Sequence, residues 1–577
     1  TKHSQTTEYR FERLYRILLN EEMYYLAYQR IYAKPGNMTQ GADGKTIDRM
    51  SLSRIEKLIA SLKDESYSPQ PSRRMYIPKK NGKTRPLGVP SFDDKLVQEV
   101  VRMVLEAIYE GHFEDTSHGF RPHRSCHTAL NAVQKTFTGK KWFIEGDIKG
   151  FFDNVNHDIL IDILKERISD ERFIRLIRKF LKAGYLEQWQ FHGTYSGMPQ
   201  GGIISPILAN IYLDKLDKYM KEYAAGFDRG NRVRAYREYE VLTYQKRLVM
   251  RELKTATNNV ERKVLVKRLK EIDKTRSAMP CFDPMDGNFK RLKYVRYADD
   301  FLIGIIVSKV KIKDDIKRFL ADRLALELSD EKTLVTHTEK PAKFLGYEVT
   351  VRKSNLQKRN KRGSLSRVYG NKVRLKVTTE VIKKKLLELG VLKFSYHNGH
   401  EQWIPKHRSE LINNDDLEIL DSYNAEIRGF YNYYSIANNA SELNTFHYIM
   451  QYSMYKTFAG KYRTTVRRIC RKYKRNGVFT VGYTVKNGKA KERRLYNEGF
   501  KRKRPSYDRS IDRCPNPMPG VSTTSLIDRL KAQKCELCGA MDNLVMHHVR
   551  KLGELKGKEN WEKLMIARRR KTMGCMR

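Results

Sequence analysis

Two adjacent carboxylates, Asp299 and Asp300, follow Tyr297-Ala298 between two apolar runs, and a third, Asp147, ends another apolar run far upstream. Neighbouring like charges at the tip of a hairpin repel each other, and a bound metal ion removes that conflict. Carboxylates that converge on Mg²⁺ from strand ends are what two-metal phosphoryl transfer requires: one ion activates an attacking 3′-hydroxyl and the other stabilises a leaving pyrophosphate. Taken alone, the four-residue pattern is equally consistent with an exposed acidic turn.

The elements that must position these acids are visible in the apolar periodicity. Residues 142–147 are predicted to form a short buried strand, and 292–307 a strand, a turn and a second strand, with polar residues only at the centre. Residues 73–90 are predicted to form a hairpin, because two apolar triplets flank the turn signal Asn81-Gly82. Helical periodicity is predicted for 8–32, 52–62, 92–109, 157–168, 208–223, 378–389, 417–438 and 442–458.

Composition narrows the class of partner. The chain has 577 residues with 113 Lys and Arg against 67 Asp and Glu, a formal net charge of +46. A field of that strength attracts polyanions, and nucleic acid is the first candidate. The alternative is a basic, solvated surface that binds no particular partner. The most hydrophobic stretch, 301–307, is too short to cross a bilayer, and no membrane association is expected. With no signal peptide and an odd number of scattered cysteines, the expected location is the bacterial cytoplasm, associated with the nucleoid, or alternatively an organelle.

Further motifs follow in a fixed order around the acids: 118–125 before Asp147, then 196–206, and after Asp300 the segments 328–333 and 344–347. This series resembles the fingers and palm of a reverse transcriptase. With His118-Gly119-Phe120-Arg121-Pro122 ahead of it, the chain resembles group II intron-encoded proteins, close to the mitochondrial-like class that serves group IIA introns. The resemblance runs from about residue 8 to the end of the chain.

The resemblance implies an α+β right-hand polymerase in four parts. Fingers and palm with an antiparallel sheet would occupy 1–370, with a charge-dense helical insertion at about 228–290. An α-helical thumb or maturase domain would occupy 371–460, and a basic DNA-binding region with its linker 461–520. A small zinc-containing HNH-like module, apparently truncated, would occupy 521–577.

The resemblance also implies roles at the polymerase site. Asp147, Asp299 and Asp300, with the backbone carbonyl of Ile148, would hold two Mg²⁺ ions. The nucleotide would be bound by five side chains, of which Phe152 would exclude a 2′-hydroxyl: Lys79, Arg85, Phe152, Gln200 and Lys332. The primer end would be gripped by Phe344, Leu345, Gly346 and Tyr347. By residue type alone, Phe152 is more often a core aromatic and a basic hairpin more often a solvated edge.

In the expected thumb, 426–434 interleaves aromatic residues with arginine, which suits stacking on RNA. The residues expected to bind RNA there are Arg428, Tyr431, Asn432 and Tyr433. Aromatics at helical spacing are more often core, and Ile427, Tyr431 and Tyr434 share one helical face, so these three are the better candidates for packing.

Residues 461–513 hold 19 Lys and Arg against four Asp and Glu, without an apolar period long enough for a large core. The resemblance implies that this segment binds target DNA, with an affinity dominated by phosphate contacts and therefore sensitive to salt. The DNA-binding candidates are Arg467, Arg468, Arg471, Lys472, Lys501 and Arg502.

Near the end, Cys535 and Cys538 have the spacing of a zinc knuckle, His547 and His548 follow, and Cys575 is a candidate third ligand for Zn²⁺. By resemblance, the module is an HNH-type endonuclease in which one histidine would act as general base, with Mg²⁺ as a further candidate ion. In that family a second CxxC follows near this point. If the protein stops at Arg577, no second-strand cleavage is expected, and if it continues, cleavage is expected.

The leading interpretation is a multifunctional enzyme that binds its intron RNA in a ribonucleoprotein, promotes splicing, and copies that RNA into DNA from dNTPs at a nicked DNA target. A second interpretation has the same polymerase and maturase without an active endonuclease. A retron or diversity-generating reverse transcriptase would lack both 426–434 and the Cys/His tail, and a decayed polymerase would not keep Asp147, Asp299 and Asp300. The oligomeric state cannot be read from the sequence.

Overall fold

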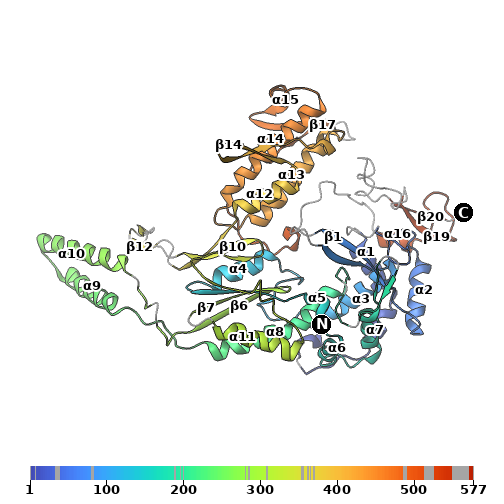
Figure 1. Ribbon diagram of the computed structural model, residues 1–577, viewed down its shortest axis with the longest axis horizontal. Helices are drawn as coiled ribbons and strands as arrows, with labels where there is room; N and C mark the ends of the chain where they lie inside the picture. The colour runs from blue at the N-terminus through green and yellow to red at the C-terminus, as the bar shows by residue number, and fades with distance from the viewer. Residues whose placement is uncertain are drawn as a thin grey trace.

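The computed structural model describes residues 2–6, 8–32, 39–78, 84–187, 190–194, 196–198, 200–279, 281–283, 286–306, 310–352, 357–359, 363, 365–367, 371–484, 490–512, 526–548 and 571–575. A broad base carries a central sheet, and a helical stem rises from it (Figure 1). A helical arm projects from one end of the base, and a small C-terminal module lies at the other end. In the described part of the chain, no helix combines the length and the apolar character needed to span a membrane.

The N-terminal part of the base is helical and carries the predicted hairpin. The expected helix at 8–32 begins only at Glu21, because the Asn20 side chain caps it by accepting from the Glu22 amide, and a short 3₁₀ turn precedes it. The hairpin pairs Arg73 with Val89 through Pro78 with Thr84, and its first strand adds β4 in parallel. The elements are η1 (Lys2–Gln5), η2 (Tyr15–Leu19), α1 (Glu21–Ile31), α2 (Leu52–Lys63), β1 (Ser72–Pro78), β2 (Thr84–Val89) and α3 (Phe92–Tyr109).

The central sheet has the order β6-β7-β3-β8, and all its pairings are antiparallel. Side chains alternate between its two faces: Ile303 packs in one core cluster with α8, whereas Leu302 packs in a second with α4. Both faces are covered, which explains why 301–306 is apolar without interruption. The elements are α4 (Cys126–Thr136), β3 (Trp142–Asp147), α5 (Phe151–Asn154), α8 (Ser205–Phe227), β6 (Arg291–Tyr297), β7 (Asp300–Ile306), α11 (Val310–Leu324) and β8 (Leu334–His337).

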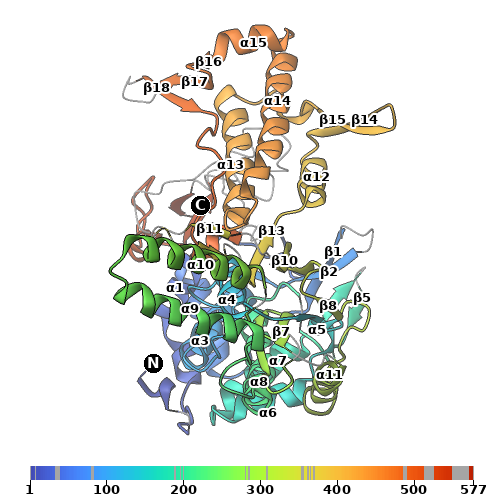
Figure 2. The same cartoon turned by 90° about the vertical axis from the view of Figure 1, so that its left-hand side faces the viewer.

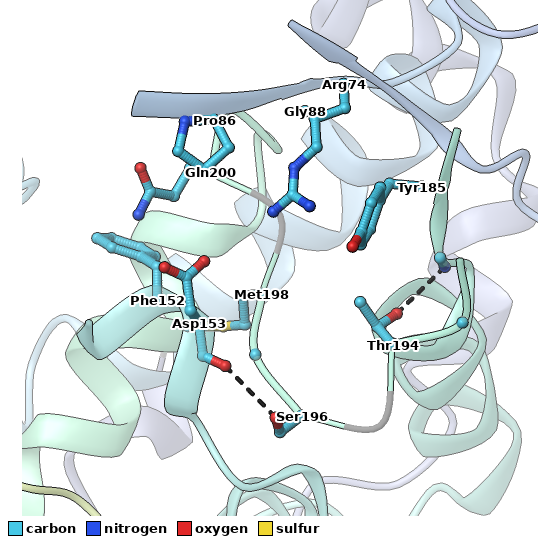
Figure 3. Close-up of a pocket in the computed structure, with 13 residues that line it drawn as sticks. Arg74, Pro86, Gly88, Phe152, Asp153, Tyr185, Thr194, Ser196, Met198 and Gln200 are labelled. Carbon is cyan, nitrogen blue, oxygen red and sulfur yellow. Dashed lines mark hydrogen bonds between the residues drawn. The ribbon is translucent and has the colours of Figure 1, made fainter. Parts of the chain in front are cut away.

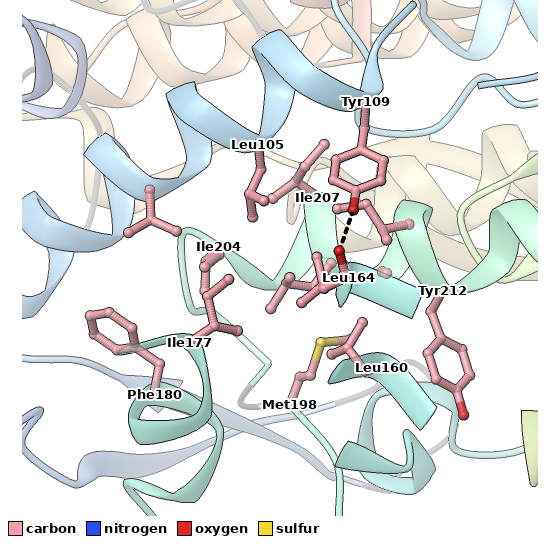
Figure 4. Close-up of a cluster of buried hydrophobic side chains, with 14 of the residues drawn as sticks. Leu105, Tyr109, Leu160, Leu164, Ile177, Phe180, Met198, Ile204, Ile207 and Tyr212 are labelled. Atoms are coloured by element: carbon pink, nitrogen blue, oxygen red, sulfur yellow. Dashed lines mark hydrogen bonds between the residues drawn. The ribbon is translucent and has the colours of Figure 1, made fainter. Parts of the chain in front are cut away.

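Under the sheet, α3 and α8 pack with α6 (His157–Lys165) and α7 (Glu171–Lys182) around one apolar cluster (Figure 4). Leu164 from α6 and Ile177 from α7 meet residues of α3 and α8 there, and the Tyr109 hydroxyl donates to the Leu164 carbonyl at 3.4 Å. The expected helix at 157–168 ends three residues early, at Lys165. Strands β4 (Tyr185–Glu187) and β5 (Gln190–His192) then join the hairpin sheet in the order β2-β1-β4-β5.

The helical insertion expected between the two halves of the sheet is present as the projecting arm. It consists of α9 (Arg237–Thr255) and α10 (Asn259–Ala278), which pack on each other through a small core of their own around Val249 and Leu265. Backbone bridges at Arg229–Lys290 and Ala235–Phe282 close its base. The arm therefore leaves the sheet undisturbed, and β6 resumes immediately after it.

The helical stem shares one continuous core with α4 and with one face of the central sheet (Figure 2). Helices α13 and α14 lie side by side, and the basic segment after them adds Ile469, Phe479 and Tyr496 to the same core. The sequence predicted no large core within 461–513. The structure shows that this segment instead contributes its apolar residues to the core of the stem. The elements between the central sheet and the end of the stem are β9 (Ala342–Phe344), β10 (Tyr347–Arg352), β11 (Gln357–Arg359), β12 (Leu365–Arg367), β13 (Lys372–Lys376), α12 (Thr379–Glu388), β14 (Leu392–His397), β15 (His400–Pro405), η3 (Ser409–Leu411), α13 (Asp416–Tyr434), η4 (Ala440–Glu442), α14 (Leu443–Lys461), α15 (Val466–Tyr473), β16 (Lys474–Arg475), β17 (Val478–Thr484) and β18 (Ala490–Arg494).

The C-terminal module docks on the N-terminal helices. Met546 donates its amide to the Met50 carbonyl at 2.8 Å and is fully buried together with Leu530. Lys531 pairs with Glu22 at 2.5 Å. The elements of this module are α16 (Leu526–Lys531), β19 (Leu544–His548) and β20 (Lys571–Cys575), of which the last two pair in antiparallel register, and η5 (Arg509–Asp512) precedes it beside α4.

Candidate active site

The three predicted acids meet at one end of the central sheet. Asp147, the last residue of β3, is the register partner of Asp300, the first residue of β7. Tyr297 at the end of β6 pairs with the same Asp300, which leaves Ala298 and Asp299 as the two residues of the turn. Strand pairing therefore brings together residues more than 150 positions apart. This outcome favours the interpretation as a site over that as an exposed acidic turn.

The cluster concentrates negative charge at the edge of the sheet, where the Asp299 side chain is half-buried and Asp300 is exposed. Desolvation by the surrounding protein, reinforced by the charges of Asp299 and Asp147, raises the pKa of Asp300 to about 7 although its side chain still reaches the surface. Burial also raises the pKa of Asp299, while Arg85 and Lys332 act in the opposite direction. The Lys332 ammonium lies 2.6 Å from Asp147 Oδ2, and that hydrogen bond raises the pKa of Lys332. The site therefore favours cations, and Lys332 already supplies one at its edge.

The donor set fits a hard divalent ion in its chemistry, because it consists of carboxylate oxygens and a nearby carbonyl. The antiparallel bridge between Ile148 and Leu328 is flanked by hydrogen bonds from Ser329 to Asp147 and from Lys149 to Glu327. In such a ladder, the Ile148 carbonyl points away from Leu328. Among the described residues, no group of three or more His, Cys, Asp and Glu side chains is arranged tightly enough to hold a metal ion.

The turn at residues 297–300, called the catalytic turn after its predicted role, is held from below by a buried ion pair that the sequence did not reveal. Arg296 and Asp217 are both fully buried, with Nε–Oδ1 and Nη2–Oδ2 distances of 2.8 and 2.5 Å. Arg296 also donates to the Ala298 carbonyl at 2.8 Å, which fixes a residue whose φ is +56°. The available signal was Asp217 on the apolar face of α8, where a charge needs a partner.

From the other side, the backbone of 117–119 packs directly on the turn. The His118 amide donates to the Arg296 carbonyl at 2.9 Å. A Cβ atom on Gly119 would lie 2.3 Å from the Ala298 amide nitrogen and 3.1 Å from the Tyr297 carbonyl carbon. Glycine is required here because any side chain would displace the turn that carries Asp299.

Replacing Gly119 with alanine is therefore expected to slow cDNA synthesis about tenfold or more and to destabilise the fold by about 1–3 kcal/mol, the usual cost of overpacking. The measurement is primer extension on an RNA template together with thermal denaturation. Gly111→Ala is the matched control, because a Cβ at Gly111 meets nothing within 4 Å. If the two variants synthesised cDNA at the same rate and melted at the same temperature, Gly119 would not be needed to support the turn.

A cavity of about 330 Å³ opens between the hairpin, the start of α5 and the loop before α8 (Figure 3). Phe152, which lines it, follows Asp147 by five residues. Phe152 and Gln200 line one side of it, and Arg74 and Tyr185 the other. Arg74 lies over the Tyr185 ring at 3.9 Å and pairs with Glu187 at 3.4 Å. Phe152 is half-buried at the rim rather than in the core. Sequence reasoning found Phe152 and Gln200 but missed Arg74 and Tyr185, because only tertiary pairing brings β4 beside β1.

The hairpin and the loop are joined at the cavity wall. The Gly88 amide donates to the Gln200 carbonyl at 2.7 Å, and a Cβ at Gly201, whose φ is +116°, would lie 2.5 Å from the Gly88 carbonyl oxygen. Arg85 is exposed on β2 and is close enough to lower the pKa of Asp299. Lys79, the other predicted hairpin cation, lies outside the described residues.

The predicted primer-grip residues form the hairpin between β9 and β10. Phe344 pairs with Tyr347 across Leu345 and Gly346, whose φ values are +49° and +73°. Two successive positive φ values define a tight two-residue turn. The Tyr433 hydroxyl of α13 donates to the Leu345 carbonyl at 2.9 Å. The stem therefore holds this turn directly.

The predicted RNA-binding residues of α13 divide into two groups. Arg428 is exposed, and Asn432 and Tyr433 are half-buried. Tyr431 is only 2% exposed and donates its hydroxyl to the Lys501 carbonyl at 2.6 Å. The expectation of an RNA contact at Tyr431 is therefore corrected: its ring belongs to the core of the stem, as the helical face it shares with Ile427 and Tyr434 indicated.

The predicted DNA-binding residues lie on the surface of the stem. On α15, Ile469 and Tyr473 are buried, and the basic residues occupy the outer face. Lys501 and Arg502 are also exposed, and Arg502 donates to the Ile436 carbonyl at 3.1 Å. The exposed basic residues of α15 are Arg467, Arg468, Arg471 and Lys472.

The two knuckle cysteines form a compact turn. The Cys538 amide donates to Cys535 Sγ at 3.4 Å, and the Cys535 amide donates to the Ala540 carbonyl at 2.8 Å. Backbone pairing brings Cys575 opposite Leu544, close in sequence to this turn. The side chains of His547, His548 and Cys575 lie outside the described part of the structure.

Family models match three parts of the chain: a reverse transcriptase (RNA-dependent DNA polymerase) at 77–244, a type II intron maturase at 371–504, and an AI2M/AI1M-like HNH endonuclease at 535–576. Group II intron-encoded protein LtrA of Lactococcus lactis is 45% identical over 572 residues, which are 98% of this chain and 94% of that protein. A putative COX1/OXI3 intron 1 protein of Saccharomyces cerevisiae is 34% identical over 94% of this chain and 65% of its own length. The first match ends inside α9, where the arm interrupts the sheet.

Proposed function

The chain belongs to the family of group II intron-encoded proteins, and on that premise we propose that Asp147, Asp299 and Asp300 form its polymerase site. It is a multifunctional protein with reverse transcriptase, maturase and endonuclease parts. The proposed reaction copies intron RNA into DNA from a nicked target. The observation that supports it best is the convergence of three carboxylates from β3 and the 297–300 turn at one end of the sheet.

In this proposal the chain is a right-hand polymerase. The central sheet is the palm, the β1–β2 hairpin and its neighbouring helices are the fingers, and the stem is the thumb with its maturase surface. The cavity beside Phe152 lies between palm and fingers, where an incoming nucleotide would meet the primer end. The expected domain boundary at 460/461 remains a prediction, and the shared core extends beyond it to Phe500.

The three acids, with the Ile148 carbonyl, would hold two Mg²⁺ ions, which supply charge neutralisation to the attacking 3′-hydroxyl and the departing pyrophosphate. The chain itself orients the reactants. The Arg296–Asp217 pair and Gly119 fix the turn, and Lys332 places a positive charge beside the acids where pyrophosphate would leave. The raised pKa of Asp300 fits a site that becomes fully ionised when cations bind.

The nucleotide would enter along the hairpin. Arg85 offers a cation to the triphosphate, with Lys79 as a second candidate, and the half-buried ring of Phe152 would lie under the sugar and exclude a 2′-hydroxyl. Gln200, on the same side of the cavity as Phe152, would also lie beside the nucleotide. The substrates would therefore be dNTPs.

The stem would hold the RNA and the DNA. The turn at Phe344–Tyr347, fixed by Tyr433, would grip the primer, and Arg428 and Asn432 are the remaining candidates for contact with intron RNA. Exposed basic residues of α15 and of 501–502 would track the phosphates of target DNA. The working form would be a ribonucleoprotein.

Replacing Arg467 and Arg471 together with alanine is expected to weaken DNA binding about equally for target and unrelated duplexes. Each phosphate contact contributes a slope of about −0.9 to the dependence of log affinity on log salt concentration, so the slope should become shallower by about 1–2. Fluorescence anisotropy at several salt concentrations measures this slope. Lys215→Ala is the control, because Lys215 is paired with Glu166 at 2.7 Å on α8. An unchanged slope would remove α15 from the DNA interface.

In the C-terminal module, Cys535 and Cys538 would bind Zn²⁺ together with Cys575 and a further ligand. The amide-to-sulfur hydrogen bond from Cys538 to Cys535 suits a thiolate, because such bonds stabilise its charge. His547 or His548 would act as the general base for cleavage of the second DNA strand, with Mg²⁺ as the candidate ion there.

The proposed function is tested with the purified chain and two substrates: an RNA template with an annealed DNA primer, and the precursor RNA that copurifies with the protein. We expect Mg²⁺-dependent cDNA from the first and faster intron excision from the second. Absence of cDNA with the wild-type chain would overturn the polymerase assignment, and unchanged excision would overturn the maturase assignment.

A further inference from the structure

A segment that runs from the end of the maturase match into the stretch between the matched domains returns to the catalytic turn. Residues 501–512, here called the strap, leave the stem and cross to the N-terminus of α4 beside the central sheet. The strap starts on the stem, where the Lys503 amide donates to the Ser435 carbonyl at 2.7 Å. It ends at η5, whose last residue is Asp512. The maturase match stops at 504 and the endonuclease match begins at 535.

Asp512 joins the strap to the turn that carries the acids. Its Oδ2 accepts a hydrogen bond from the Tyr297 hydroxyl at 3.0 Å. The same carboxylate accepts from the Cys126 amide, at 3.3 and 3.4 Å to its two oxygens. Cys126 is the first residue of α4, so the carboxylate also lies at the positive end of that helix dipole. Tyr297 is itself the register partner of Asp300, one peptide group from Ala298.

A second set of contacts joins the strap to the primer-grip turn. The Ser125 hydroxyl donates to the Ser506 carbonyl at 2.9 Å, and the Ser506 amide donates to His127 Nδ1 at 3.4 Å. His127 Nε2 then donates to the Tyr433 carbonyl at 2.7 Å. The Tyr433 hydroxyl in turn holds the Leu345 carbonyl. Residues 125–127 thus connect the strap, the catalytic turn and the primer-grip turn.

We propose that Asp512 is a positioning residue of the polymerase: it fixes the Tyr297 side chain, and through it the 297–300 turn, against α4. The inference rests on the proposed polymerase function and assigns part of that site to the strap. It extends the polymerase beyond the reverse transcriptase domain, so the connection to the endonuclease module contributes to DNA synthesis.

The hydrogen bond from the Tyr297 hydroxyl to Asp512 is directional and partly buried, so it can fix the orientation of the Tyr297 side chain. Tyr297 is anchored at its backbone by β7 and at its hydroxyl by Asp512, so the residue cannot rotate away from the sheet while both hold. A hydrogen bond to a charged acceptor is stronger than one between neutral groups. Loss of the carboxylate would leave the Tyr297 hydroxyl without this acceptor and would free the last residue of β6 next to the acids.

The test measures single-turnover incorporation of dTTP on poly(rA) primed with oligo(dT), using the full chain. The rate constant reports on correctly folded enzyme, whereas the amplitude reports the active fraction, so a purely structural role would lower the amplitude only. Asp512→Ala is expected to slow the rate constant about tenfold with an unchanged amplitude. Asp512→Asn, which keeps one acceptor oxygen, is expected to recover part of that loss.

Two further variants make the test specific. Asp508→Ala is the matched control, because among the described residues the Asp508 carboxylate accepts hydrogen bonds from Ser510 alone, and its rate should equal that of the wild type. Tyr297→Phe removes the hydroxyl, and the double variant with Asp512→Ala should be no slower than Tyr297→Phe alone, because both remove the same bond.

Three results would overturn the inference: a wild-type rate in Asp512→Ala, a loss of amplitude alone, or a double variant whose loss is the product of the single losses. Failure of the proposed function is distinguishable, because in that case the wild-type chain itself would incorporate no dTTP.

Discussion

Asp299→Asn is expected to reduce cDNA synthesis at least about a thousandfold, which corresponds to about 4 kcal/mol of lost transition-state stabilisation. Asparagine keeps the size of the side chain but removes the charge that the proposed Mg²⁺ ions require. The turn should stay in place, because it is held by Arg296 and Gly119 rather than by the Asp299 side chain. The measurement is primer extension on a primed RNA template with saturating dNTPs.

Asp330→Asn is the matched control for this variant. Asp330 is an acid near the same sheet, but it is exposed and pairs with Lys313 and Lys317 at 3.3 and 2.7 Å. Its substitution should leave cDNA synthesis within about twofold, as expected for a surface ion pair. The Asp299→Asn protein should still promote intron splicing, because the substitution leaves the stem unchanged. Substantial cDNA synthesis by Asp299→Asn would refute the two-metal assignment.

Arg296→Met is expected to be the most destabilising single substitution of the site. It leaves Asp217 as an uncompensated buried charge, and breaking a buried pair in this way costs about 3–5 kcal/mol. For a domain of this size, the apparent melting temperature should fall by roughly 10 °C. Polymerase activity should fall with it, because Arg296 also holds the Ala298 carbonyl.

A second substitution separates charge burial from lost packing. Arg296→Met combined with Asp217→Asn removes both charges and keeps an acceptor for the Tyr294 hydroxyl, so part of the stability should return. Lys221→Met is the control, because the Lys221–Glu114 pair is exposed and contributes at most about 1 kcal/mol. If the double variant is less stable than Arg296→Met, the buried charge is not the cause.

Much of the fold and of the candidate site could be predicted because it depends on local patterns: apolar runs, turn signals and helical periodicity. The apolar runs ending at Asp147 and flanking Asp299 predicted the strands correctly, and the turn signal Asn81-Gly82 predicted the hairpin. The helical face shared by Ile427, Tyr431 and Tyr434 predicted packing, and the structure confirms it at the expense of the RNA contact expected for Tyr431. The helix expected to begin at residue 8 starts at Glu21, because Asn20 caps it locally.

The sequence by itself determined the chemistry of this protein: which acids, in which order, and a net charge of +46 for a polyanionic partner. The tertiary structure decided which residues hold that chemistry in place. Asp217, Gly119 and Asp512 come from three distant parts of the chain and meet at residues 296–298. Their roles depend on a buried charge, a close backbone approach and a long-range hydrogen bond. No local periodicity encodes such contacts, because each arises only when separate elements pack together.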